Sequence, residues 1–237
     1  AAPMIAGIRL RAGRAGSGKG AASMVSQAVA TARAAGACGQ ILIRGDSAYG
    51  SRAVIGAALK AGVKFSLVLA KNPAVQRAIA TIAEDAWTPV HYPGAVTDPD
   101  TGQLISDAEV AEVDYTAYAG TKHAVTARLI VRRVRDLNPH HQSELFTVYR
   151  YHAVFTNSPL PMLAAETDHR DHAIIEQVIA DLVDGPLAHL PSGDFAANAA
   201  WLTCAGIEHN LRRAAATLDQ PRVFRTGFLL VLCYFLA

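Results

Sequence analysis

The alternation of helical and strand-like segments over residues 20–82 is the feature that most constrains the fold. Each helical segment is built from good helix formers, and each strand-like segment is a short, β-branched or aromatic apolar run. The order is a helix at 20–35 ended by Gly36, a strand at 40–44, a helix at 52–60 closed by Gly62, a strand at 64–69, and a helix opened by Asn72 and Pro73. Such alternation predicts a parallel α/β sheet with right-handed crossovers.

The pattern changes at residue 85. Up to residue 157 the chain is rich in turn formers and in alternating runs at 111–118, 124–134 and 145–155, which predicts a mostly antiparallel β insertion. Two helices are then expected, at 171–184 and 195–217. The predicted domains are therefore 1–84 (first part of a core), 85–157 (β-rich insertion), 158–217 (second part of the core) and 218–237 (divergent apolar tail).

The composition is that of a soluble protein, since 51% of the 237 residues are apolar, enough to bury a core. The three cysteines lack metal-ligand spacing and are odd in number, which favours a reducing cytoplasm. Residues 227–237 are intensely apolar but shorter than the roughly 20 residues that a membrane helix needs. We therefore predict a cytoplasmic protein with no membrane partner.

Positive charge is unevenly distributed, although the formal net charge is only +2. Residues 1–45 contain six Lys and Arg and no Asp or Glu, and residues 122–135 hold five more basic side chains. Clusters of this kind can neutralise phosphates on a nucleic acid, or can be ordinary solvated faces.

Asp46 is the first candidate for a chemical role. It directly follows the strand 40–44, and ligands of α/β sheets bind beyond the carboxyl ends of strands. The alternative is structural, because Asp46 or Ser47 can cap the helix that follows.

Glu176 is the second candidate, in the middle of the predicted helix 171–184. At about 3.6 residues per turn, His169, His172, Glu176 and Val183 share one helical face. A surface glutamate is the simpler alternative. The order of these features along the chain, a strand-end Asp, a long β-rich segment and then a Glu on a helix, favours a catalytic role for both Asp46 and Glu176.

Six phrases of the sequence resemble DDE-type transposases of actinobacterial insertion sequences, and the likeness extends from about residue 3 to residue 215. They are ILIRGDSAYG, EDAWTPVHYP, DAEVAEVDYT, ARLIVRRVRDLNP, YRYHAVFTNSPL and HAIIEQVIADLVDGPLAHLPSGDFAANAAWL. The resemblance implies an RNase H-like core interrupted by a β insertion, DNA as substrate, and a homodimer in a synaptic complex. It makes Asp46 the second aspartate and Glu176 the glutamate of a metal-binding triad.

Mg²⁺, with Mn²⁺ able to substitute, is the cofactor that the resemblance implies. Phosphodiester cleavage and strand transfer are in-line displacements that two such ions promote, and hard cations take carboxylate ligands. The family's first aspartate has no counterpart in residues 1–45, so the resemblance also implies an N-terminally truncated, inactive chain.

Four further residues are candidates for contact with DNA. In many relatives the positions of His169, His172 and Val183 carry tyrosine, arginine and lysine. Protonated histidines can still bind phosphate, whereas valine cannot. Arg212 and Arg213 can bind phosphate or form a solvated helix end. Trp201 is expected to lie in the core rather than to stack on a base.

Two other functions remain open. Residues 13–20 (GRAGSGKG) approach a phosphate-binding P-loop, but Gly20 lacks the hydroxyl for Mg²⁺ and arginines precede the loop. The chain can also be a catalytically dead DNA-binding remnant. An in-frame upstream strand that ends in Asp would instead indicate a piece of an active enzyme.

Overall fold

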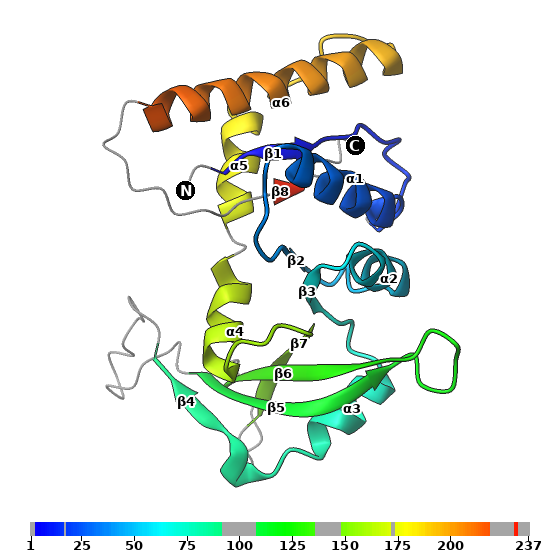
Figure 1. Ribbon diagram of the computed structural model, residues 1–237, viewed down its shortest axis with the longest axis vertical. Coiled ribbons are helices and arrows are strands. Elements are labelled where there is room, and N and C mark those ends of the chain that lie inside the picture. Colours follow the sequence, from blue (N-terminus) through cyan, green and yellow to red (C-terminus); the bar gives the residue numbers. More distant parts are fainter. Residues whose placement is uncertain are drawn as a thin grey trace. The chain divides into compact units, whose positions relative to one another are not determined.

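The computed structural model describes residues 3–16, 18–91, 108–135, 148–171, 174–218 and 230–231. These residues form two compact units, and each is described by itself. Unit 1 comprises residues 1–43, 53–63 and 170–237, and unit 2 comprises residues 44–52 and 64–169. Figure 1 shows the elements of both along the chain.

Unit 1 is mainly helical. Its elements are β1 (Ile5–Gly7), α1 (Ala21–Ala34), most of α2 (Arg52–Lys60), α5 (Ile174–Val183), α6 (Phe195–Leu218) and β8 (Leu230–Val231). Strands β1 and β8 pair in parallel although they come from distant parts of the sequence. The predicted helices at 20–35, 52–60, 171–184 and 195–217 are confirmed to within a few residues.

Apolar residues spaced three or four apart hold the unit 1 helices in place. Val178 and Leu182 of α5 pack with Leu202 and Ala205 of α6. Leu187, in the turn after α5, belongs to the same cluster. Gly36 and Gly62 end α1 and α2 with φ of +92° and +66°, in the left-handed region that favours glycine.

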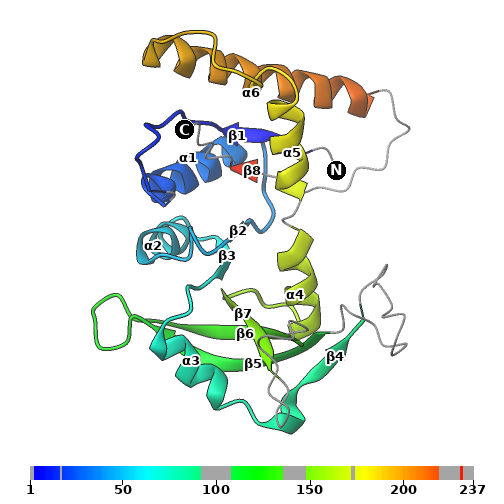
Figure 2. The ribbon, with the colours of Figure 1, turned by 180° about the vertical axis from the view of Figure 1, so that it is seen from behind.

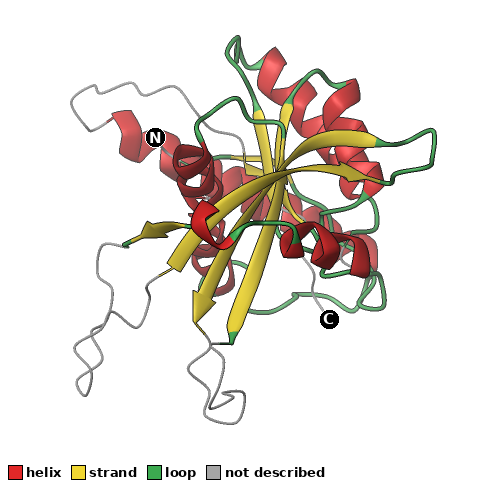
Figure 3. Cartoon of the chain, turned by 90° about the horizontal axis from the view of Figure 1, so that it is seen from below, coloured by secondary structure: helices red, strands yellow, loops and turns green. Residues whose placement is uncertain are grey.

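Unit 2 contains most of one six-stranded sheet with the order β2-β3-β7-β6-β5-β4. The strands are β2 (Leu42–Gly45), β3 (Lys64–Val68), β4 (Thr88–Val90), β5 (Ala108–Ala117), β6 (Val125–Arg135) and β7 (Tyr149–Thr156). The helical elements are α3 (Pro73–Ala80), the short 3-10 helix η1 (Glu84–Ala86) and α4 (Met162–Arg170). The long strands lie side by side in Figure 3.

The β-rich segment is antiparallel, as predicted, and its pairing extends to β3. Strand β3 pairs antiparallel with β7, and the β7–β6, β6–β5 and β5–β4 pairs are antiparallel as well. The six-stranded sheet is therefore mostly antiparallel, in a mixed α/β fold, and parallel pairing of the strands expected at 40–44 and 64–69 stays a prediction. The β-rich segment is continuous with β3 because residues 154–156 pair with residues 66–68.

Helix α4 packs on one face of this sheet, as Figure 2 shows from behind. Ala165 and Met162 of α4 contact Val110 of β5 and Ile130 of β6. On the other face the ring of Phe155 packs against Phe65 and Tyr115, at centroid distances of 5.3 and 5.7 Å. Sequence analysis missed α4, because Glu166 and His169 are among its buried residues and the usual apolar period is absent.

Candidate active site

Asp46 directly follows β2 and lies in a turn with an exposed side chain. Its Oδ1 accepts a hydrogen bond from the backbone N–H of Ala48 at 2.9 Å, and its carbonyl accepts one from Tyr49. This is a local Asx-type turn. Helix α2 begins only at Arg52, so the prediction that Asp46 or Ser47 caps that helix is wrong.

The turn that carries Asp46 is held closely against β3. A Cβ atom at Gly50 would lie 2.0 Å from the carbonyl oxygen of Val68, a distance that no side chain tolerates. At Gly45 a Cβ atom would lie 3.1 Å from the side chain of Leu67. Both glycines therefore allow the backbone to approach β3, which fixes where the carboxylate of Asp46 stands in unit 2.

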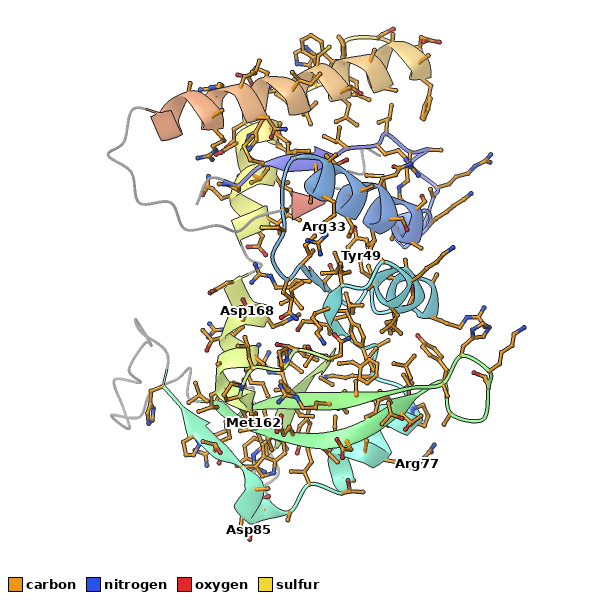
Figure 4. The ribbon with its side chains drawn as sticks, in the orientation of Figure 1. Arg33, Tyr49, Arg77, Asp85, Met162 and Asp168 are labelled. Atoms are coloured by element: carbon orange, nitrogen blue, oxygen red, sulfur yellow. The ribbon has the colours of Figure 1, made fainter. Side chains whose placement is uncertain are left out.

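Arg44 ties the same segment to α4 and was missed as a functional candidate. Its Nη1 donates to the backbone carbonyl of Asp168 and lies 3.5 Å from the Asp168 carboxylate. Figure 4 labels Asp168 on α4. An arginine at the end of an otherwise apolar strand was the sequence signal for such a tether.

Glu176 stands in the first turn of α5 with an exposed side chain. Helix α5 is anchored by Val178 and Leu182, which are 0% and 1% exposed. The helix thus holds Glu176 in a defined orientation within unit 1, while its carboxylate faces solvent. Asp46 belongs to unit 2.

The histidines do not extend the Glu176 helix as predicted. His169 lies on α4, which ends at Arg170, whereas α5 begins at Ile174, so the expected single helical face is not continuous. His169 is only 5% exposed, and its Nδ1 forms a 2.9 Å hydrogen bond with Ser66 Oγ. The prediction for His172 lies outside the described residues.

The candidates on α6 have mixed surroundings. Arg212 is exposed and lies 3.4 Å from Glu208, one turn earlier, and Arg213 forms an ion pair with Asp181 of α5. The pKa of Asp181 is lowered by hydrogen bonding from Gln177 and by Arg213. Trp201 is 40% exposed and donates from Nε1 to the Pro186 carbonyl, so the prediction of a core tryptophan is wrong.

Two properties of the carboxylates fit a divalent metal. Asp46 and Glu176 offer hard oxygen ligands, and both are exposed, so neither is committed to a buried ion pair. Within the described residues no group of three or more His, Cys, Asp or Glu side chains is close enough to hold a metal ion. Each carboxylate is therefore available as a hard oxygen ligand within its own unit.

No helix in the described part of the chain is long and apolar enough to cross a membrane. Comparison with known families gives a match over most of the sequence: the family model described as transposase DDE domain, group 1, aligns with residues 3–224. No curated protein matches the sequence. The match covers far more than half of the chain, which therefore belongs to the group 1 family of transposase DDE domains.

Proposed function

We propose that this domain catalyses metal-dependent DNA cleavage and strand transfer at the ends of an insertion sequence, with Asp46 and Glu176 as ligands of Mg²⁺ or Mn²⁺. The observation that carries the proposal is the family match over residues 3–224, which includes both carboxylates. Both carboxylates are exposed: Asp46 stands in a turn held against β3, and Glu176 stands in the first turn of α5, which packs in the unit 1 core. When bound, the metal ions activate the attacking oxygen and stabilise the leaving oxygen.

The chain's own residues hold and orient these groups. Packing of the Asp46 turn against β3 and the tether from Arg44 to α4 position one carboxylate, and packing of α5 on α6 positions the other. The wider proposal comprises an RNase H-like core with boundaries at 84/85, 157/158 and 217/218, a synaptic homodimer, and contacts to DNA from His169, His172, Arg212 and Arg213.

A catalytically dead DNA-binding remnant is the second candidate, because residues 1–45 contain no carboxylate that could complete a triad. We propose that full activity needs a third carboxylate from outside these residues. The nucleotide-binding alternative is weaker. Arg11 donates to the carbonyls of Gly16 and Lys19 in the glycine-rich loop, so those carbonyls face a cation where a phosphate cradle needs N–H groups.

The test of the site is Mn²⁺ binding to the purified chain, followed by electron paramagnetic resonance. We expect Asp46→Asn and Glu176→Gln each to weaken binding by about tenfold or more, since each removes a ligand. Asp85→Asn, at an exposed carboxylate of η1 labelled in Figure 4, is the control and should bind like the parent.

A parallel assay measures Mg²⁺- or Mn²⁺-dependent cleavage of insertion-sequence ends by a longer chain that includes an upstream strand ending in Asp. Cleavage should collapse in both variants. Unchanged metal binding and unchanged cleavage in Asp46→Asn or Glu176→Gln would refute the assignment of that residue.

A further inference from the structure

Three basic side chains share one face of the sheet where β6 ends and β7 begins. Arg132 of β6 pairs with His152 of β7, and Val134 pairs with Arg150. Residues that face each other across strands point to the same side, and so do residues two apart along a strand. Arg132, His152 and Arg150 therefore lie together, on the face that also carries Ile130.

Lys71 lies in the segment after β3, which ends at Val68. The N–H of Leu69 donates to the carbonyl of Ala153 at 3.0 Å, so the chain after β3 continues alongside β7. The pKa of His152 is lowered, mainly by partial burial. The positive charges of Arg132, Lys71 and Arg150 lower it further, which places Lys71 near His152. Lys71, Arg132, Arg150 and His152 are called the cationic edge below.

The cationic edge differs from the neighbouring arginines in how its charges are compensated. Arg128, on the same face, lies 3.5 Å from Glu112 and donates to the Leu160 carbonyl. Arg133, on the opposite face, is paired with Glu84 and Glu109. Lys71, Arg132 and Arg150 have no hydrogen bond or ion pair with any residue that the structure describes.

Among the described residues no carboxylate pairs with these cations; gathering like charges in this way is unfavourable, and a bound anion removes that cost. Arg132 and Arg150 lie on adjacent strands spaced by about 4.8 Å, Lys71 lies in the segment after β3, and Lys71 and Arg150 are exposed. A linear polyanion matches this spread of charge better than a single small anion does. Duplex DNA carries one negative charge per about 1.7 Å of its axis.

We propose that the cationic edge binds the phosphate backbone of duplex DNA without reading its sequence. The choice of DNA as the polyanion rests on the proposed function. The cationic edge itself rests on the β6–β7 register of Arg132, Arg150 and His152 and on the lack of an ion-pair partner for Lys71, Arg132 and Arg150 among the described residues. Arg132 and Arg150 are the principal phosphate contacts, and Lys71 and His152 flank them.

The test measures binding of fluorescein-labelled duplex DNA by anisotropy, in EDTA so that metal chemistry plays no part, over a series of salt concentrations. The variant is Arg132→Gln/Arg150→Gln. The control is Lys60→Gln/Arg77→Gln, which removes the same charge from α2 and α3; Arg77 is labelled in Figure 4. The charge of Arg77 acts on Tyr115, which points to the opposite face of the sheet.

We expect the slope of log affinity against log salt to become shallower by about 2 in the variant, since each lost phosphate contact removes about one released counterion. The loss should be equal for two duplexes of unrelated sequence, and Arg132→Lys/Arg150→Lys should largely restore the slope. Excess inorganic phosphate should compete only weakly.

Equal slopes in the variant and the control would overturn the inference while leaving the proposed function intact. Full competition by millimolar inorganic phosphate would overturn it too, in favour of a small-anion site. A parent chain that binds no DNA at all would contradict both the inference and the proposed function. Far-ultraviolet circular dichroism of every variant shows whether a lost contact reflects a lost fold.

Discussion

Arg132 and Arg133 are neighbours in the sequence with opposite surroundings. Arg133 is 4% exposed, hydrogen-bonds with Glu84 and Glu109, and lies 4.3 Å from the ring centroid of Trp87 and 4.4 Å from that of Tyr149. These carboxylates raise its pKa. Arg132 has none of these contacts. Strand alternation thus makes one arginine part of the packing of unit 2 and leaves the other for a ligand.

The surroundings of His152 predict a pH dependence of stability. Folding lowers its pKa through partial burial and through Arg132, Lys71 and Arg150. The unfolded chain therefore binds the proton more readily, so this contribution to stability is complete above the unfolded pKa of about 6.5 and is lost as pH falls below it.

We expect the melting temperature of the parent chain to fall between pH 7.5 and pH 5 by more than that of His152→Gln, when thermal unfolding is followed by circular dichroism. His123→Gln, in the exposed β5–β6 turn, is the matched control and should behave like the parent. Identical pH profiles for the parent and His152→Gln would contradict the prediction.

At the scale of elements, the turn after β2 depends on the close approach of Gly50 to β3. In Gly50→Ala the new Cβ would collide with the Val68 carbonyl, so the turn must move. We expect a loss of about 1–3 kcal/mol in the free energy of unfolding, as in other overpacked sites, and weaker Mn²⁺ binding through Asp46.

Gly56→Ala is a matched control for this change. Gly56 lies inside α2, and a Cβ there would meet nothing within 4 Å. Because alanine favours the helix more than glycine does, Gly56→Ala should raise stability by about 0.5–1 kcal/mol. Urea denaturation of both variants measures whether the free energy of unfolding falls in Gly50→Ala and rises in Gly56→Ala. Equal destabilisation at the two positions would show that the close approach of Gly50 to β3 is not the cause.

Local patterns predicted most elements but not how the strands pair. Helix α3 shows why, since Asn72 Oδ1 accepts from Ala74 and Val75 at 2.9 and 3.0 Å and Pro73 occupies the first turn, all signals within a few residues. The pairing of β3 with β7 joins residues about ninety positions apart, and no local period records it. Sequence therefore located Asp46 and Glu176 on their elements and singled out the basic run at 122–135, which includes Arg132, but it did not predict that Arg132 lies beside Arg150 and His152.

At the scale of the whole molecule, unit 1 is assembled from both ends of the sequence. The side chain of Asn210 in α6 forms two hydrogen bonds with the backbone of β1. Its Oδ1 accepts from the Ile5 N–H at 2.7 Å, and its Nδ2 donates to the Ile5 carbonyl at 2.8 Å. This side chain holds β1 against the helices in addition to the β1–β8 pairing.

Asn210→Ala removes both hydrogen bonds and leaves a backbone donor and acceptor without that partner. We expect a loss of about 1–3 kcal/mol in the free energy of unfolding, measured by urea denaturation. Asn210→Asp keeps the acceptor for the Ile5 N–H but turns a carboxylate oxygen toward the Ile5 carbonyl, so it should not restore the stability of the parent. Equal stability of the parent and Asn210→Ala would show that this amide does not anchor β1.

The same arrangement sets an order of events during synthesis. The described strands of the six-stranded sheet and helix α4 have all been translated by residue 170, so unit 2 can begin to pack on the nascent chain before α6 is complete. Asn210 follows Ile5 by about two hundred residues, so their hydrogen bonds cannot form until α6 has been made, and closing so long a loop is slow. Strand β1 is thus translated long before the helix that holds it, and until then its apolar residues are open to chaperones.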